Sequence, residues 1–108
     1  MDRPDLSISV HRTGGEAVVT LVGEIDMSTV QRLAKVVDEM LVTEVPPRIV
    51  LDLSGVTFCD SQGLGTLVVL SRKAQHARTV LALVNVGDFL MRVLDITGLR
   101  GALAIQDS

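Results

Sequence analysis

The chain has 108 residues, of which 47% are hydrophobic and 21% charged, with a formal net charge of −3. This length and composition predict one folded domain over residues 1–108, with a core from about 6 to 105. The negative charge and the presence of only two aromatic residues argue against nucleic-acid binding, which uses basic faces and stacking platforms. No apolar run reaches the length of a membrane span, and a lone cysteine fits a reducing compartment, so we expect a cytoplasmic protein.

The first part of the chain predicts two strands and a helix. Leu6–Val10 alternates apolar and polar residues with a period of two, which indicates a strand near the edge of a sheet. A Gly-Gly turn leads to a second strand at Ala17–Val22, and the pair predicts a hairpin. Ser28 and Gln31 have the spacing of a capping box, which places a helix start at Ser28. The apolar stripe expected for this helix is Val30, Leu33, Ala34, Val37 and Leu41.

Residues 48–70 predict a strand, a turn and a largely buried helix. The apolar run Ile49–Leu53 indicates a buried strand that ends at Ser54-Gly55, after which the chain returns to the core. Asp60 or Ser61 is suited to cap the following helix, because a side-chain oxygen there can accept a free backbone N–H.

Two glycines, Gly63 and Gly65, leave the first turn of this helix without side chains, so that another molecule can approach closely. A helix N-terminus also favours an anion, including a phosphate attached to a hydroxyl placed there. An ordinary helix cap explains the same residues without any function.

The remainder of the chain predicts a strand, a helix and a short final strand. Val80–Val84 is a nearly continuous apolar run, which is typical of a strand covered on both faces. A third helix follows and ends at Gly98, with four residues expected to point inward: Phe89, Leu90, Val93 and Leu94. The order β-β-α-β-α-β-α, with a short strand at Leu103–Ile105, predicts a small α/β fold. Its mixed sheet has about four to five strands, and its later strands are parallel.

The chain offers no pattern typical of an enzyme, a metal site or a cofactor site. His11 and His76 have no Cys or His nearby at ligand spacing. Cys59 fits a small buried hydrophobic residue better than a redox sensor. Asp26 and Asp60 could form an acid/base pair, but each is explained more simply by ending a strand and capping the next segment of the chain.

Four separated motifs together resemble one known family, the STAS domain, and more narrowly the bacterial anti-sigma factor antagonists. The resemblance covers about Leu6 to Ile105 and implies a single STAS domain with a small mixed sheet and helices. The motifs are Gly-Glu-Ile-Asp at 23–26, Leu-Asp-Leu-Ser-Gly-Val-Thr-Phe at 51–58, Asp-Ser-Gln-Gly-Leu-Gly at 60–65 and Arg-Val-Leu-Asp-Ile-Thr-Gly-Leu at 92–99.

The resemblance also implies a function. Such antagonists bind an anti-sigma factor that is itself a serine kinase of the histidine-kinase-like ATPase fold, and binding frees a sigma factor for transcription. Phosphorylation of the antagonist by that kinase then breaks the complex. The resemblance implies no catalytic residue and no cofactor, and it leaves a homodimer open. The contact residues that it implies are Asp26, Asp60, Ser61, Gln62, Gly63 and Leu64.

The sequence departs from this family at the residue that is usually phosphorylated. That residue directly precedes the glycine of an Asp-Ser-Ser-Gly-Leu or Asp-Ser-Thr-Gly-Leu motif, and here it is Gln62, which has no hydroxyl. We favour a constitutive antagonist in which Gln62 keeps the neutral character of the unphosphorylated form. Two alternatives remain open: the kinase modifies Ser61 instead, or the domain is an accessory subunit of a lipid-transport ATPase or a stressosome-like assembly. A small-molecule sensor is a further hypothesis, weakened by the absence of Lys or Arg near this turn.

Overall fold

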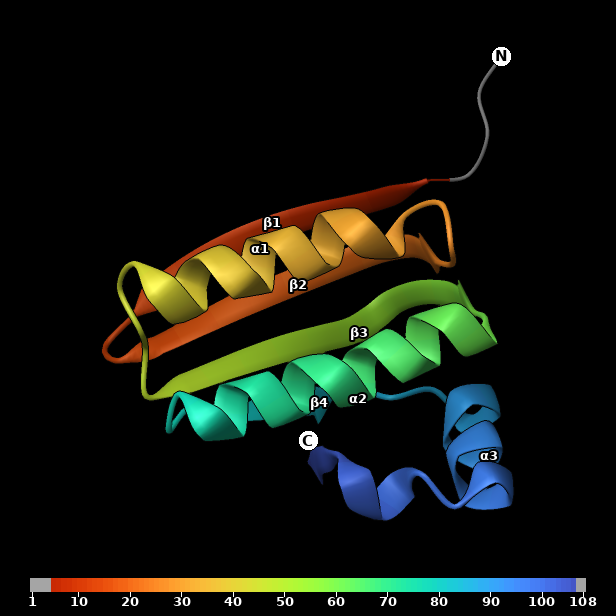
Figure 1. Ribbon diagram of the computed structural model, residues 1–108. Helices are drawn as coiled ribbons and strands as arrows, with labels where there is room; N and C mark the ends of the chain where they lie inside the picture. Colours follow the sequence, from red (N-terminus) through yellow and green to blue (C-terminus); the bar gives the residue numbers. More distant parts are fainter. Residues whose placement is uncertain (1–4, 107–108) are drawn as a thin grey trace.

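The computed structural model describes residues 5–106, which form a five-stranded sheet and three α-helices (Figure 1). The strands lie in the sheet in chain order, from β1 to β5. Their bounds are β1 Leu6–Thr13, β2 Glu16–Ile25, β3 Arg48–Cys59, β4 Val80–Val84 and β5 Ala104–Gln106. The helices are α1 Val30–Val42, α2 Ser61–His76 and α3 Asp88–Thr97, followed by a 3₁₀ turn, η1, at Arg100–Ala102.

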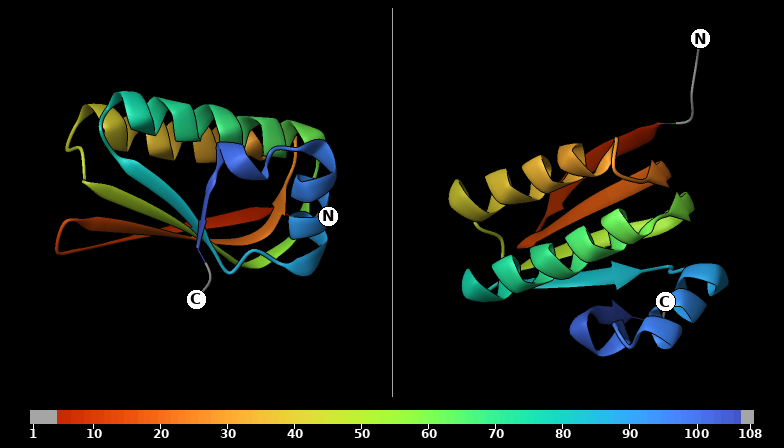
Figure 2. Two further views of the ribbon diagram at one scale, coloured as in Figure 1. Left: turned by 90° about the horizontal axis from the view of Figure 1, so that it is seen from below. Right: turned by 45° about the vertical axis from the view of Figure 1, so that its right-hand side comes forward.

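The topology confirms the predicted α/β fold with a mixed sheet. Strands β1 and β2 form the antiparallel hairpin, β1 is an edge strand, and β2 to β5 pair in parallel. Helices α1 and α2 cover one face of the sheet, while α3 lies at the end of the sheet where β3 ends (Figure 2). Within residues 5–106, no helix is long and apolar enough to cross a membrane.

The core lies between the sheet and the helices α1 and α2. Alternate residues of the strands point toward these helices, as the period of two requires. In the parallel register of β2 and β3, Ala17 pairs with Ile49 and Val19 with Leu51, and all four are fully buried. In α1, the predicted stripe is buried at Val30, Leu33 and Val37; Met40 is buried as well, whereas Leu41 is only half-buried.

The prediction that the central strand ends at Ser54-Gly55 is wrong. Strand β3 continues to Cys59, and its register against β2 shifts between Thr20 and Val22 and again between Gly23 and Glu24. Extra residues of β3 are thus accommodated as bulges rather than as a turn. Gly55 allows the two strands to approach here, because a Cβ would lie 2.9 Å from the Leu21 carbonyl oxygen.

Two further details differ from the predictions. Helix α1 begins at Val30 rather than Ser28, and its N-cap residue, Thr29, makes no side-chain capping bond. Ser28 instead donates its hydroxyl to Asp26, so the expected capping box does not form. Phe89 was expected to point inward from α3, but 68% of its surface is exposed, and the buried residues of this helix are Leu90 and Leu94.

Candidate functional site

Helix α2 begins at the carboxyl ends of the parallel strands β2 and β3, and its first residues are held in place by Asp60. The backbone N–H of Asp60 donates to the carbonyl oxygen of Ile25 at 3.0 Å. Its carboxylate Oδ1 accepts the backbone N–H of Gly63 at 2.8 Å, which makes Asp60 the N-cap. Of the two candidate residues, Asp60 thus caps the helix, and the Ser61 hydroxyl is left out of the cap.

The same carboxylate joins α2 to the loop that follows β2. Oδ2 of Asp60 accepts the backbone N–H of Met27 at 3.2 Å, so one side chain spans two loops that are 33 residues apart in sequence. Asp60 therefore has a structural role that accounts for both of its oxygens. Asp26 and Asp60 thus both stabilise the loops to which they belong.

The loop after β2 is organised by Asp26. Its Oδ1 accepts the hydroxyl of Ser28 at 2.7 Å and the backbone N–H groups of Ser28 and Thr29 at 2.9 and 3.2 Å. The Ser28 hydroxyl is the main cause that lowers the pKa of Asp26 below its ordinary value of 3.8, so this carboxylate stays ionised at neutral pH. Thr29 is buried and donates its hydroxyl to the carbonyl oxygen of Glu24 at 2.8 Å, which fixes the loop to β2.

Gly63 does not leave an open approach for another molecule, contrary to the expectation from sequence. It is buried, and a Cβ there would lie 2.7 Å from Cγ2 of Ile25, 2.8 Å from the Ile25 carbonyl oxygen and 3.1 Å from Sγ of Cys59. Gly63 is thus required so that the first turn of α2 can pack on the ends of β2 and β3. Gly65 does fit the prediction of a bare, exposed surface, because a Cβ there would meet no atom within 4 Å.

The six predicted contact residues therefore fall into two groups. Ser61 and Gln62 are exposed, and within residues 5–106 neither side chain has a hydrogen-bond partner; Asp26 and Asp60 are half-buried beside them. Gly63 and Leu64 are buried, and Leu64 has only 4% of its surface exposed. A partner that meets this end of the molecule would contact the first group. The second group lies beneath the surface and packs under the first.

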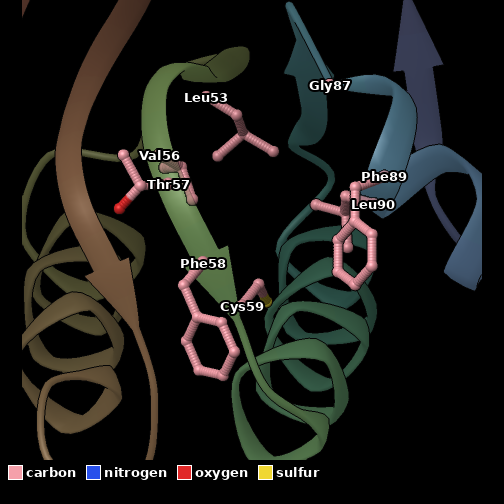
Figure 3. Close-up of a pocket in the computed structure, with 8 residues that line it drawn as sticks. All are labelled: Leu53, Val56, Thr57, Phe58, Cys59, Gly87, Phe89 and Leu90. Carbon is pink, nitrogen blue, oxygen red and sulfur yellow. The ribbon is translucent and has the colours of Figure 1, made fainter.

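Three exposed apolar residues lie at the same end of the molecule and were not predicted as site residues. They are Met27 (69% exposed), Phe58 (45%) and Phe89 (68%). Phe58 and Phe89 line a cleft of about 70 Å³ between the end of β3 and the start of α3, together with Leu53, Val56, Thr57, Cys59, Gly87 and Leu90 (Figure 3). Helical periodicity placed Phe89 inside, so the sequence signal for this cleft was the position of Phe58, two residues before Asp60.

Carboxylates predominate at this end, where Arg32 pairs with Asp5 and Arg92 lies four residues after Asp88 on α3. The segments 24–29, 58–69 and 85–91, which follow or end the parallel strands β2, β3 and β4, contain four carboxylates and no Lys or Arg. The four are Glu24, Asp26, Asp60 and Asp88. Such a surface attracts basic groups and disfavours a phosphate, which is evidence against a nucleotide or anion sensor at the Asp60–Gly65 turn.

Cys59 lines the cleft and is half-buried. Its burial raises the pKa of the thiol to about 11, with a smaller contribution from the neighbouring charge of Asp60. A thiol that stays protonated is a poor nucleophile, in agreement with the interpretation of Cys59 as a packing residue. Both histidines are exposed, and residues 5–106 hold no cluster of three or more metal-ligating side chains.

Comparisons with known proteins, by sequence and by structure, point to the same family. The STAS domain family profile matches residues 7–108. The anti-sigma-B factor antagonist of Listeria monocytogenes is 34% identical over 106 residues, which cover 95% of this chain and 90% of that protein. An anti-sigma factor antagonist from Mycobacterium paratuberculosis has a crystal structure that superposes with a TM-score of 0.81, at 32% identity, over 94% of this chain and 85% of that one.

The unphosphorylated form of the anti-sigma factor antagonist SpoIIAA superposes with a TM-score of 0.80 over 94% of this chain and 88% of that one. At 18% identity this likeness bears on the fold alone. The sheet order, the match over nearly the whole chain and these relatives lead to one conclusion: the chain belongs to the STAS-domain family.

Proposed function

We propose that this protein is an anti-sigma factor antagonist, which binds an anti-sigma factor and so frees a sigma factor for transcription. Relatives that carry this name match nearly the full length of the chain at 29 to 34% identity. The observation that carries the proposal is the start of α2, where Ser61 and Gln62 are exposed on a turn that Asp60 holds rigidly. A preorganised surface of this kind reduces the entropic cost of binding.

The partner that we propose is a kinase-type anti-sigma factor with the histidine-kinase-like ATPase fold, acting in the cytoplasm. Phosphorylation would place nearly two negative charges on the α2 start, beside Asp26 and Asp60. Segments 24–29 and 58–69 contain no Lys or Arg to pair with it, so that charge would have to lose its water without a partner when another protein packs closely against it. Gln62 is neutral and cannot accept a phosphate, so we propose that this antagonist is constitutive.

A displaced switch at Ser61 is the second candidate, and one observation favours it. The Ser61 hydroxyl is exposed and is not used to cap α2, because Asp60 performs that role. A kinase that reaches the first turn of α2 could therefore transfer a phosphate to Ser61. An accessory role in a transport or stressosome-like complex has no comparable support in the side chains of this end.

Binding to purified partners tests the proposal. Each histidine-kinase-like anti-sigma factor of the host is purified and titrated with the chain by calorimetry, and the release of the bound sigma factor is followed in parallel. We expect one of them to bind, and Gln62→Glu to weaken that binding about tenfold or more, since it would bury an unpaired charge in a closely packed contact. Gln75→Glu is the matched control, because Gln75 is also exposed on α2 but lies near its other end. Failure of the parent chain to bind any of these proteins would overturn the proposal.

A further inference from the structure

Both phenylalanines of the chain are exposed, and both lie on one cleft beside the start of α2. Phe58 is on β3, two residues before Asp60, and Phe89 is in the first turn of α3. Figure 3 shows Phe58 on the β3 side of the cleft and Phe89 and Leu90 on the α3 side. An aromatic side chain carries a large apolar area, so a pair left in water favours a surface that is covered by another protein.

The cleft itself has the size and chemistry for one apolar side chain. Its volume of about 70 Å³ is well below the roughly 300–1,000 Å³ of small-molecule sites. Its lining is apolar apart from Thr57, whose hydroxyl already donates to the carbonyl oxygen of Gly23 at 3.2 Å. Cys59 adds no reactive group, because its thiol stays protonated at neutral pH.

The charges around the cleft specify the neighbours of that side chain. Asp60 follows the lining residues Phe58 and Cys59 in sequence, and Asp88 lies between the lining residues Gly87 and Phe89. The nearest Lys or Arg in sequence is Arg92, four residues after Asp88 on α3. Two carboxylates beside the lining favour Lys or Arg on the surface that covers the cleft.

We infer that the cleft between Phe58 and Phe89 is the second half of the docking surface, and that it receives an apolar side chain of the anti-sigma factor flanked by Lys or Arg residues. The inference rests on the proposed function and adds the chemistry of the partner to it. The start of α2 determines whether the complex can form, because a charge at Gln62 opposes it. The cleft determines which anti-sigma factor fits, because only a partner with an apolar residue between basic ones fills it.

The first test removes the aromatic side chain. Phe89→Ala is measured by calorimetry against the anti-sigma factor that binds the parent chain, and we expect at least about a tenfold loss of affinity, as for a central aromatic anchor. Val42→Ala is the matched control, because Val42 is 78% exposed but lies at the far end of α1. The control should bind like the parent. Since Phe89 is mostly exposed, circular dichroism and the unfolding midpoint should show an intact fold.

A second variant fills the cleft instead of removing a group. Gly87 lines the cleft with an ordinary backbone conformation, and a Cβ there would meet no atom within 4 Å. Gly87→Leu should therefore fold and yet exclude the partner's side chain, with a loss of affinity of about tenfold or more.

Asp88→Asn tests the charge: the association rate should fall, and it should depend less on salt than that of the parent.

The outcomes separate this inference from the proposed function. Binding that is sensitive to Gln62→Glu but unchanged by Phe89→Ala and Gly87→Leu would overturn the cleft and leave the antagonist role intact. Absence of binding by the parent chain would overturn both. Loss of binding in both cleft variants, with Val42→Ala unchanged, supports the cleft as part of the docking surface.

Discussion

The two ends of the sheet differ in how they use their polar groups. At the amino end of the parallel strands, Arg48 pairs with Glu16 at 3.0 Å and also donates to the side chain of Gln106. The buried Thr79 donates its hydroxyl to the carbonyl oxygen of Pro46 at 2.8 Å. At the carboxyl end, Asp26 and Asp60 accept only backbone and hydroxyl donors, and the ion pair beside them joins Arg32 of α1 to Asp5 at 2.7 Å.

The difference supports the proposal that the carboxyl end of the strands meets a partner. At the amino end, the opposite charges of Arg48 and Glu16 link β3 to β2, and the hydrogen bond from Arg48 to the neutral side chain of Gln106 links β3 to β5. Like charges and exposed aromatic residues at the carboxyl end bring no such benefit to the free molecule, because neighbouring carboxylates repel and apolar surface remains in water. The proposed docking surface would cover these groups.

The largest expected effect is at Gly63, where the carboxyl end is most tightly packed. A methyl group in Gly63→Ala would overlap both the side chain and the carbonyl oxygen of Ile25, so we expect a loss of about 1–3 kcal/mol in the free energy of unfolding. Gly65→Ala is the matched control on the same turn, and it should be neutral or up to about 1 kcal/mol more stable, since Ala favours helices. Urea denaturation measures both.

Equal stability of the two glycine variants would contradict this packing. It would mean that the first turn of α2 can shift away from β2 and β3 without cost. In that case the exposed positions of Ser61 and Gln62 would not be rigidly held.

Asp60→Ala should have the next largest effect. It removes the N-cap of α2 and the bond to the backbone N–H of Met27, for an expected loss of about 1 kcal/mol in stability. Asp60→Asn should lose less, because an amide oxygen can still accept one of these bonds. Thermal unfolding of the two variants beside the parent gives the comparison, and equal losses in both would point to the charge rather than to the cap.

The smallest effect is expected at the opposite end. Arg48→Ala breaks a partly exposed ion pair with Glu16, so its cost should stay within about 1 kcal/mol of stability. Binding of the anti-sigma factor should not change, because Arg48 lies at the amino end of β3 and the contact surface at the other. A loss of affinity in Arg48→Ala with an intact fold would contradict the proposal that only the carboxyl end of the strands contacts the partner.

The fold could be predicted from sequence because its elements have clear periods. Alternation in β1 and the apolar stripe of α1 depend on local spacing, and both were assigned correctly in outline. The bulges of β3 were missed because they arise from pairing with β2, which lies more than 20 residues earlier in the chain. Ser54 and Gly55 have the composition of a turn, and only pairing with the neighbouring strand determines that β3 continues through them.

The site was predicted less completely than the fold, for a similar reason. Residue type identified the Asp60–Gln62 turn, but burial depends on what packs against it, so Gly63 and Leu64 were placed on the surface although they lie beneath it. Phe89 was assigned to the core because helical spacing shows which residues share a face and not whether another element covers that face.

The most direct test of a permanently unphosphorylated switch is mass spectrometry of the complex with ATP. The parent chain and Gln62→Ser are each incubated with the kinase-type anti-sigma factor and ATP, and both phosphate incorporation and complex stability are followed. The parent chain should gain no phosphate and stay bound, whereas Gln62→Ser should gain one phosphate and dissociate. A phosphate on the parent chain that Ser61→Ala abolishes, together with release of the complex, would contradict a constitutive antagonist and place the switch at Ser61.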